Sequence, residues 1–405
     1  MGYTFPQFGG GVMPWKECRV MDEKVRFVAR LMNGEQMTDL CREFGISRKT
    51  GYKILDRYKQ FGVGAFTDRS RRPVRLANQL PLQVENTILR IKREKSTWGA
   101  RKIRELIKRR FPDIRPPANS TIHAVLDRHG LVSPRGRRRN RALGTALSEG
   151  RIANDLWCAD YKGEFMLGNR QYCYPLTITD HASRYLLACE GLTTTKEQYA
   201  FTVFENTFKE HGLPLAIRTD NGVPFASANS LFNLSKLSVW WLRLGIQIER
   251  IQPGQPQQNG RHERMHLTLK KETTKPAGEN LLQQQAKFDE FLEEYNAERP
   301  HEALAMKTPE EVYTRSERSY RGISPIDYPL HDRSIEVTSC GRICIGKMKI
   351  NLSQVFAGQK MGLKEVSEGV WLVTFMDYDL GYFDTESFRF EPLNNPFGPK
   401  VLPMS

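Results

Sequence analysis

The period of the apolar residues changes twice along this chain, and this change limits the possible folds more than any other feature. Residues 22–132 carry apolar side chains at the helical period, as in "DEKVRFVARLMNG". Strand-like apolar runs mixed with helices begin near residue 155 and continue to about 317. Residues 333–393 then alternate, as in "RICIGKMKI" and "GVWLVTFMD", which is typical of β-hairpins. We therefore expect a multidomain protein with α-helical, α/β and small all-β parts.

Positive charge is concentrated in the helical part. The 405 residues include 61 Lys and Arg and 46 Asp and Glu, a net charge of +15. Residues 1–142 hold 32 basic and 13 acidic residues, a net +19, and the remaining residues hold 29 and 33, a net −4. Such an asymmetry favours a polyanionic partner for the first third of the chain.

Several classes of protein are disfavoured. The seven cysteines include no Cys-x2-Cys pair, so a structural zinc site is not expected. The amino-terminal residues lack the layout of a signal peptide. No run of about 18 apolar residues is present, so a membrane span is not expected. These features indicate a cytoplasmic protein.

Residues 22–61 predict three helices, with Thr38 and Ser47 as N-caps and a tight turn at Gly45. This is the helix-turn-helix layout, and an ordinary helical hairpin with a solvated basic face is the alternative. We favour a DNA-binding domain over residues 1–66. The start of its last helix would offer DNA contacts from Arg48, Lys49, Tyr52 and Lys53.

A second helical DNA-binding domain is predicted over 80–132, with Asn119 or Ser120 as a cap. Basic linkers surround it at 67–79 and 133–153. Each of the runs "TDRSRRPVR" and "SPRGRRRNR" is either a solvated charged segment or an arm that lies on the phosphates of DNA. The DNA-contacting candidates in these linkers are Arg71, Arg72, Arg137, Arg138 and Arg139.

Three acidic residues occupy informative positions. Asp160 lies in a predicted buried strand, and Asp220 ends the strand in "LAIRTDNGVPFA". Taken alone, Asp-Asn-Gly is a turn signal. Glu263 begins a helix after "PGQPQQNG", with Met265 and Leu269 on its apolar face. His266 and Lys270 would share one polar stripe with Glu263.

Converging carboxylates repel one another unless cations neutralise them. Two magnesium ions about 4 Å apart would do so, and they would activate the attacking oxygen and stabilise the leaving oxygen of a phosphoryl transfer. Carboxylate oxygens suit such hard cations. Mn²⁺ is the alternative ion.

The motifs "WCADYKGEF", "GLPLAIRTDNGVPFA", "IQPGQPQQNGRHERMHLTLKKE" and "YNAERPHEALAMKTPEEVY" closely resemble the integrase-like DDE transposases of bacterial insertion sequences, whose core is similar to that of retroviral integrase. The resemblance implies a ribonuclease-H-like α/β core over 154–317 and leaves 318–405 as a small barrel-like β domain. It places the catalytic and metal-binding acids at Asp160, Asp220 and Glu263.

The same resemblance implies a nucleoid-associated enzyme that binds the terminal repeats of its element. It would free a 3′ hydroxyl and join it to target DNA, as a dimer or higher assembly. A DNA-binding repressor with a retired core and a nuclease without strand transfer are the alternatives. An intact acid triad disfavours the repressor.

The spacing of the acids departs from the family, because 42 residues lie between Asp220 and Glu263. We place the surplus in "ASANSLFNLSKLSV", as a loop or helix on the surface of the core. Asp180 also ends a strand and is expected to be a turn or cap. His266 and Lys270 are candidate DNA contacts, and a solvated charge is the alternative for Lys270. Trp240 and Trp241 are expected in the core.

Overall fold

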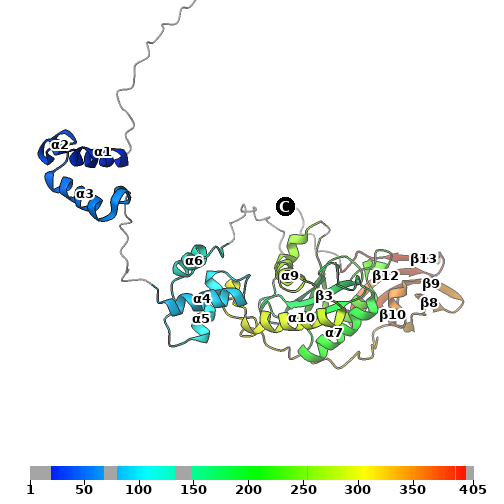
Figure 1. The fold of residues 1–405 in the computed structure, drawn as a ribbon. Helices are drawn as coiled ribbons and strands as arrows, with labels where there is room; N and C mark the ends of the chain where they lie inside the picture. The colour runs from blue at the N-terminus through cyan, green and yellow to red at the C-terminus, as the bar shows by residue number, and fades with distance from the viewer. Residues whose placement is uncertain (1–19, 68–79, 133–146, 253, 388, 398–405) are drawn as a thin grey trace, which may run out of the picture. The chain divides into compact units, whose positions relative to one another are not determined.

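The computed structural model describes residues 20–67, 80–132, 147–252, 254–387 and 389–397 (Figure 1). The chain divides into two compact units, residues 1–81 and 82–405. Among the described residues, no helix combines the length and the apolar character that crossing a membrane requires.

The first unit is a three-helix bundle, as predicted (Figure 1). It consists of α1 (Val20–Met32), α2 (Met37–Glu43), α3 (Arg48–Phe61) and the short η1 (Gly62–Phe66). Ser47 caps α3 by accepting a hydrogen bond from Thr50 N at 3.2 Å. The predicted cap at Thr38 is wrong, because α2 begins at Met37 with Gln36 as its N-cap.

A glycine allows the second and third helices to pack closely. A Cβ at Gly51 would lie 2.7 Å from both the Cys41 and the Met37 sulfur atoms. Any larger residue would push α3 away from α2. The orientation of α3 therefore depends on this one small residue.

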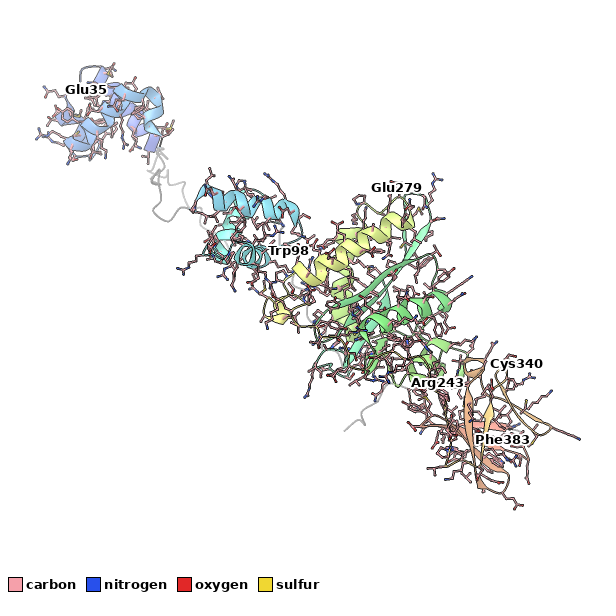
Figure 2. All side chains as sticks on the ribbon, turned by 90° about the horizontal axis from the view of Figure 1, so that it is seen from below. Glu35, Trp98, Arg243, Glu279, Cys340 and Phe383 are labelled. Atoms are coloured by element: carbon pink, nitrogen blue, oxygen red, sulfur yellow. The ribbon has the colours of Figure 1, made fainter. Side chains whose placement is uncertain are left out.

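The second unit begins with α4 (Leu82–Glu94), α5 (Ala100–Arg110) and α6 (Asn119–Arg128). Ala118 is the N-cap of α6 and provides no side-chain hydrogen bond, so the predicted caps at Asn119 and Ser120 are wrong. Trp98, labelled in Figure 2, is 1% exposed. The Arg299 guanidinium lies 5.8 Å from its ring centroid. This contact, with an ion pair of 2.9 Å between Lys95 and Glu294, attaches the helices to the core that follows.

The core contains a mixed sheet with strand order β2-β3-β1-β5-β6, and β4 also pairs with β3. β1 runs antiparallel to β3 and parallel to β5, which in turn runs parallel to β6. The strands are β1 (Leu156–Tyr161), β2 (Phe165–Met166), β3 (Tyr172–Asp180), β4 (Leu186–Leu192), β5 (Ala216–Thr219) and β6 (Gln247–Arg250). This is the α/β core that the motifs predict.

Helices cover both faces of the sheet. One hydrophobic cluster joins the sheet to α7 (Glu197–His211) and α8 (Lys236–Arg243), and it includes Trp240 and Trp241, as expected. A second cluster joins it to α9 (Gly260–Thr273) and α10 (Leu281–Glu293). Trp157 and Ala159 of β1 belong to the first cluster. Because side chains alternate along a strand, Asp160 points to the opposite face, where α9 contacts β1.

The carboxyl-terminal domain is an antiparallel sheet of order β13-β12-β11-β10-β7 with a separate hairpin β8-β9. β8 contacts β7 and β9 contacts β13, so the hairpin bridges the two edges of the sheet, as a barrel-like domain requires. Phe383, labelled in Figure 2, is fully buried in this domain. The strands are β7 (Arg333–Glu336), β8 (Arg342–Ile345), β9 (Met348–Asn351), β10 (Lys360–Ser367), β11 (Val370–Phe375), β12 (Tyr378–Asp384) and β13 (Arg389–Pro392).

The surplus between Asp220 and Glu263 is not a surface loop, which corrects the prediction. Phe232, Leu234 and Val239 from this segment pack into the hydrophobic core of the carboxyl-terminal domain. Arg243 at the end of α8 donates a hydrogen bond of 2.6 Å to Gln359 of that domain. The extra residues therefore join the two domains.

Candidate active site

The edge of the core sheet where β1 and β5 end brings the first two predicted acids together. Cys158 of β1 is in register with Arg218 of the parallel strand β5. Two residues further along each strand are Asp160 and Asp220. Since parallel strands end at the same edge of a sheet, both carboxylates emerge on that edge.

The Asp-Asn-Gly motif combines a turn with an acid. The Asp220 carboxylate accepts a hydrogen bond of 3.0 Å from Gly222 N, which forms an Asx-turn. The Asn221 side chain donates a hydrogen bond of 2.7 Å to Ile251 O, the first residue after β6. Asp220 therefore both forms the predicted turn and brings a carboxylate to the end of the strand.

The third acid is held by α9. Met265 and Leu269 are buried against the sheet, as predicted. Glu263, in the first turn of this helix, is exposed. The amphipathic helix thus fixes the position of Glu263 beside the strand ends.

The electrostatics of Asp160 connect the three acids. Burial and, with smaller effects, the negative charges of Asp220 and Glu263 together raise the pKa of its carboxyl group to about 7. Since the charges of Asp220 and Glu263 both act on Asp160, the three carboxylates contribute to one region of negative potential.

Two lysines border this region. Burial lowers the pKa of Lys162, and the charge of Lys270 lowers it further, while Asp160 opposes the change. Lys270 is exposed on α9. Lys162 therefore lies near Asp160 and Lys270 lies near Lys162, although only Lys270 was identified from the sequence. The helical spacing between Glu263 and Lys270 made Lys270 identifiable. Lys162 lies in a loop after β1, where no sequence pattern marks it.

The prediction that His266 belongs to an exposed polar stripe is wrong. Its ring is 7% exposed and packs edge-on against His262 at 4.6 Å between centroids. The His266 Nε2 atom lies 2.7 Å from the Thr177 hydroxyl. A direct contact between His266 and DNA is therefore not compatible with its burial.

This buried network of two histidines and two threonines was missed. Thr177 and Thr179 alternate with apolar residues on β3, and His262 and His266 are one helical turn apart on α9. These two spacings together are a detectable signal, since each places its pair on one face. Only the packing of α9 on β3 shows that the two faces meet.

Asp180 is a turn residue, as expected. Its buried carboxylate accepts hydrogen bonds from the backbone N–H groups of Asn154 and Ser183, each at 2.8 Å. It also accepts one of 2.6 Å from the Ser183 hydroxyl. These three donors occupy the carboxylate and tie the β3–β4 turn to the start of β1.

A buried ion pair supports the loop in front of α9. Arg218 Nε donates to Glu249 Oε1 at 2.6 Å, across the β5–β6 ladder. Arg218 also donates to the Gln258 carbonyl at 3.3 Å. This guanidinium therefore connects the strand before Asp220 to the loop before Glu263.

The "YNAERPH" motif closes the core by packing. The Asn296 side chain accepts a hydrogen bond from Leu186 N at 2.8 Å and donates one to Leu186 O at 2.9 Å, as a neighbouring strand would. Arg299 donates two hydrogen bonds of 3.0 Å to the Glu272 carboxylate. These contacts give Asn296 and Arg299 a structural role.

The predicted DNA-contacting residues of the first unit are all exposed on the first two turns of α3: Arg48, Lys49, Tyr52 and Lys53. The linker candidates lie outside the residues that the structure describes: Arg71, Arg72, Arg137, Arg138 and Arg139.

Family models agree with this organisation. Residues 150–256 and 244–309 match integrase core domains. Residues 23–73 match a helix-turn-helix domain, and residues 50–126 match a homeodomain-like domain.

Two insertion-element proteins are similar in sequence. The IS407 uncharacterized 31.7 kDa protein of Burkholderia multivorans is 23% identical over 55% of this chain and 78% of its own length. The IS476 uncharacterized 39.2 kDa protein of Xanthomonas euvesicatoria is 24% identical over 52% of this chain, and the match spans only 59% of that relative.

Retroviral integrases are among the similar solved structures. The HTLV-2 integrase catalytic core domain in complex with magnesium matches 41% of this chain and 99% of its own, with 17% identity and a TM-score of 0.33. A simian T-cell lymphotropic virus intasome in complex with PP2A regulatory subunit B56 gamma matches 72% and 97%, with 14% identity and a TM-score of 0.35.

The helix-turn-helix matches, the integrase core matches and the insertion-element relatives together support the predicted resemblance to the integrase-like transposases of insertion elements.

Proposed function

We propose that the protein binds the terminal repeats of its element, cleaves there to expose a 3′ hydroxyl and joins that hydroxyl to target DNA. The observation that carries this proposal is the convergence of Asp160, Asp220 and Glu263, since both other acids raise the pKa of Asp160. Three carboxylates at one edge suit a reaction in which cations balance charge on phosphoryl oxygens.

The donor set fits divalent cations. Without a cation, burial and the charges of Asp220 and Glu263 favour a proton on Asp160, whose pKa is raised. Asp160, Asp220 and Glu263 would hold two Mg²⁺ ions, whose chemistry is to activate the attacking oxygen and to stabilise the leaving oxygen. Such oxygen ligands at a partly exposed edge leave room for a substrate phosphate.

The remaining residues of the site would bind and orient DNA. Lys162 and Lys270 would contact phosphates beside the cleaved bond, because the Lys162 ammonium group lies near Asp160 and that of Lys270 lies near Lys162. Arg218 would hold the loop before Glu263 in place through its hydrogen bond to the Gln258 carbonyl. The first unit would recognise the terminal repeat through α3, whose amino-terminal turns expose Arg48 and Lys49.

Two ends of one element must be joined, so we propose a dimer or higher assembly. Within this assembly, the carboxyl-terminal β domain would bind DNA or another subunit. The protein would act in the cytoplasm, at the bacterial nucleoid.

The proposal is tested by incubating the protein with labelled DNA copied from the sequences that flank its own gene, Mg²⁺ and a supercoiled plasmid. Glu263→Gln runs in parallel, with Glu293→Gln on α10 as a matched control, since that side chain is also an exposed helical glutamate. We expect joined products with the wild type and the control, and none with Glu263→Gln.

Either of two other results would overturn the proposal in favour of another function. Nicked ends without joined products would indicate a nuclease. Shifted but uncut DNA with every protein would indicate a DNA-binding repressor.

A further inference from the structure

The Thr177 hydroxyl determines the protonation of the buried histidine pair. Its oxygen lies 3.1 Å from the Asp160 carbonyl oxygen, 2.8 Å from His262 Nε2 and 2.7 Å from His266 Nε2. A hydroxyl has one proton to donate and two lone pairs to accept with. A carbonyl can only accept, so Thr177 donates to Asp160 O, and both imidazoles must donate from Nε2.

Both imidazoles are neutral, which fixes the other ring nitrogen. Both rings are buried with their centroids 4.6 Å apart, so a positive charge on either ring is unfavourable, and His266 Nδ1 lies 3.7 Å from Asp160 Oδ2, too far for a charged hydrogen bond. A neutral imidazole carries one N–H, and here it is on Nε2, so each Nδ1 has a free lone pair.

The two Nδ1 atoms have different surroundings. His262 Nδ1 lies 2.7 Å from the Thr179 hydroxyl, which can donate to it, so this histidine is fully hydrogen-bonded. His266 Nδ1 lies 3.7 Å from Asp160 Oδ2. When Asp160 is deprotonated, as a metal ligand must be, two acceptors therefore face each other at the active site, at a distance too long for a hydrogen bond.

A cation would satisfy both acceptors. Two ligand atoms that are each about 2.1 Å from one cation lie roughly 3–4 Å apart, depending on the coordination angle. The separation between His266 Nδ1 and Asp160 Oδ2 falls in this range. Asp160, His262 and His266 can all bring ligand atoms within 4.8 Å of one another. His262 nevertheless does not qualify, because threonine hydroxyls occupy both of its nitrogens.

We propose that His266 Nδ1 is a ligand, beside Asp160, of a divalent cation at the active site. The inference rests on the proposed function, since it adds a nitrogen ligand to the acids of that site. An imidazole favours a transition-metal cation such as Mn²⁺ over Mg²⁺, which prefers oxygen ligands. His262 is a positioning residue, because its hydrogen bond to Thr177 helps to hold the tautomer of His266.

Pulsed electron paramagnetic resonance of the full chain with bound Mn²⁺ tests the ligand directly. We expect a ¹⁴N coupling from a directly bound imidazole, replaced by a ¹⁵N coupling when all eight histidines are ¹⁵N-labelled. The labelled wild type needs no substitution, so this result does not depend on whether a variant folds.

Two variants assign the signal. His266→Gln should abolish the nitrogen coupling, whereas His123→Gln, which replaces an exposed histidine on α6, should leave it unchanged. By calorimetry, His266→Gln should weaken Mn²⁺ binding roughly tenfold or more and Mg²⁺ binding less. Thermal unfolding of each metal-free variant verifies that it is folded.

The outcomes separate this inference from the proposed function. Bound Mn²⁺ without any nitrogen coupling would overturn the role of His266 and leave the three-acid site intact. A coupling that persists in His266→Gln and disappears in His262→Gln would also overturn it. If neither Mn²⁺ nor Mg²⁺ binds the wild type, the proposed metal-dependent function fails as well.

Discussion

The helix-turn-helix unit and the active-site edge of the core differ in how far apart their functional residues lie along the chain. In α3, the exposed basic residues Arg48, Lys49 and Lys53 lie within two helical turns. At the active site, Asp160, Asp220 and Glu263 come from two strands and one helix. A local surface is created by one helix and its cap, whereas a converging site depends on every element that sets the sheet and docks α9. Function in the two regions should therefore be lost independently and by different means.

The largest expected effect separates catalysis from DNA binding. Asp220→Asn should lower strand transfer by roughly 10³-fold or more, because it removes one of three converging carboxylates. Binding of terminal-repeat DNA should stay within about twofold, since α3 is untouched. Gel-based transfer and binding assays on one preparation measure both, with Asp113→Asn as the exposed control. A parallel loss of binding would mean that the two regions are not independent.

An effect of pH on the free energy of unfolding that arises from Asp160 should be confined to the core. The pKa of Asp160 is raised from 3.8 to about 7, so the folded, metal-free protein holds this proton more tightly than the unfolded chain. The contribution of Asp160 to the free energy of unfolding should therefore fall between pH 4 and pH 7, by roughly 2–4 kcal/mol. Asp160→Asn should lack this loss and be more stable than the wild type at pH 8.

Urea unfolding in the presence of a chelator, at pH 5 and pH 8, measures this difference. Tryptophan fluorescence follows the core, in which Trp157 and Trp241 are fully buried. If wild type and Asp160→Asn respond equally to pH, Asp160 is not the group responsible.

DNA affinity should depend on α3 and on salt. The double substitution Arg48→Ala and Lys49→Ala should weaken binding to terminal-repeat DNA about 10–100-fold and reduce the salt slope by about two. Fluorescence anisotropy at several salt concentrations measures both quantities. Lys59→Ala, at the other end of the same helix, is the matched control and should have little effect. An unchanged salt slope would show that these side chains do not contact phosphates.

The smallest expected effect concerns the cap of α3. Ser47→Ala removes the hydrogen bond to Thr50 N and should cost about 1 kcal/mol of local stability. Amide hydrogen exchange in α1–α3 should accelerate about fivefold, while exchange in the core sheet stays unchanged. Acceleration in the core as well would show that the two units do not unfold separately.

The missed features at the active site have a common cause. His262 and His266 were visible at helical spacing, and Thr177 and Thr179 at strand spacing. Nothing in either pattern specifies that α9 lies on that face of β3. In the same way, the long spacing between Asp220 and Glu263 predicted a surface insertion, but the carboxyl-terminal domain covers the apolar side chains of Phe232 and Leu234 in this segment.

By itself, the sequence determined the helix-turn-helix unit, the mixed α/β character of the core and the β domain, and it offered the three acids as a candidate site. These features depend on local periodicity, turn residues and family motifs, all of which act over a few neighbouring residues. Only the tertiary structure decided which faces meet: the burial of His266 against Thr177, the tie between Arg218 and the Gln258 loop, and the attachment of α4–α6 through Trp98. Such contacts join residues that are far apart in the chain, and their partners are fixed by how the elements pack rather than by local pattern.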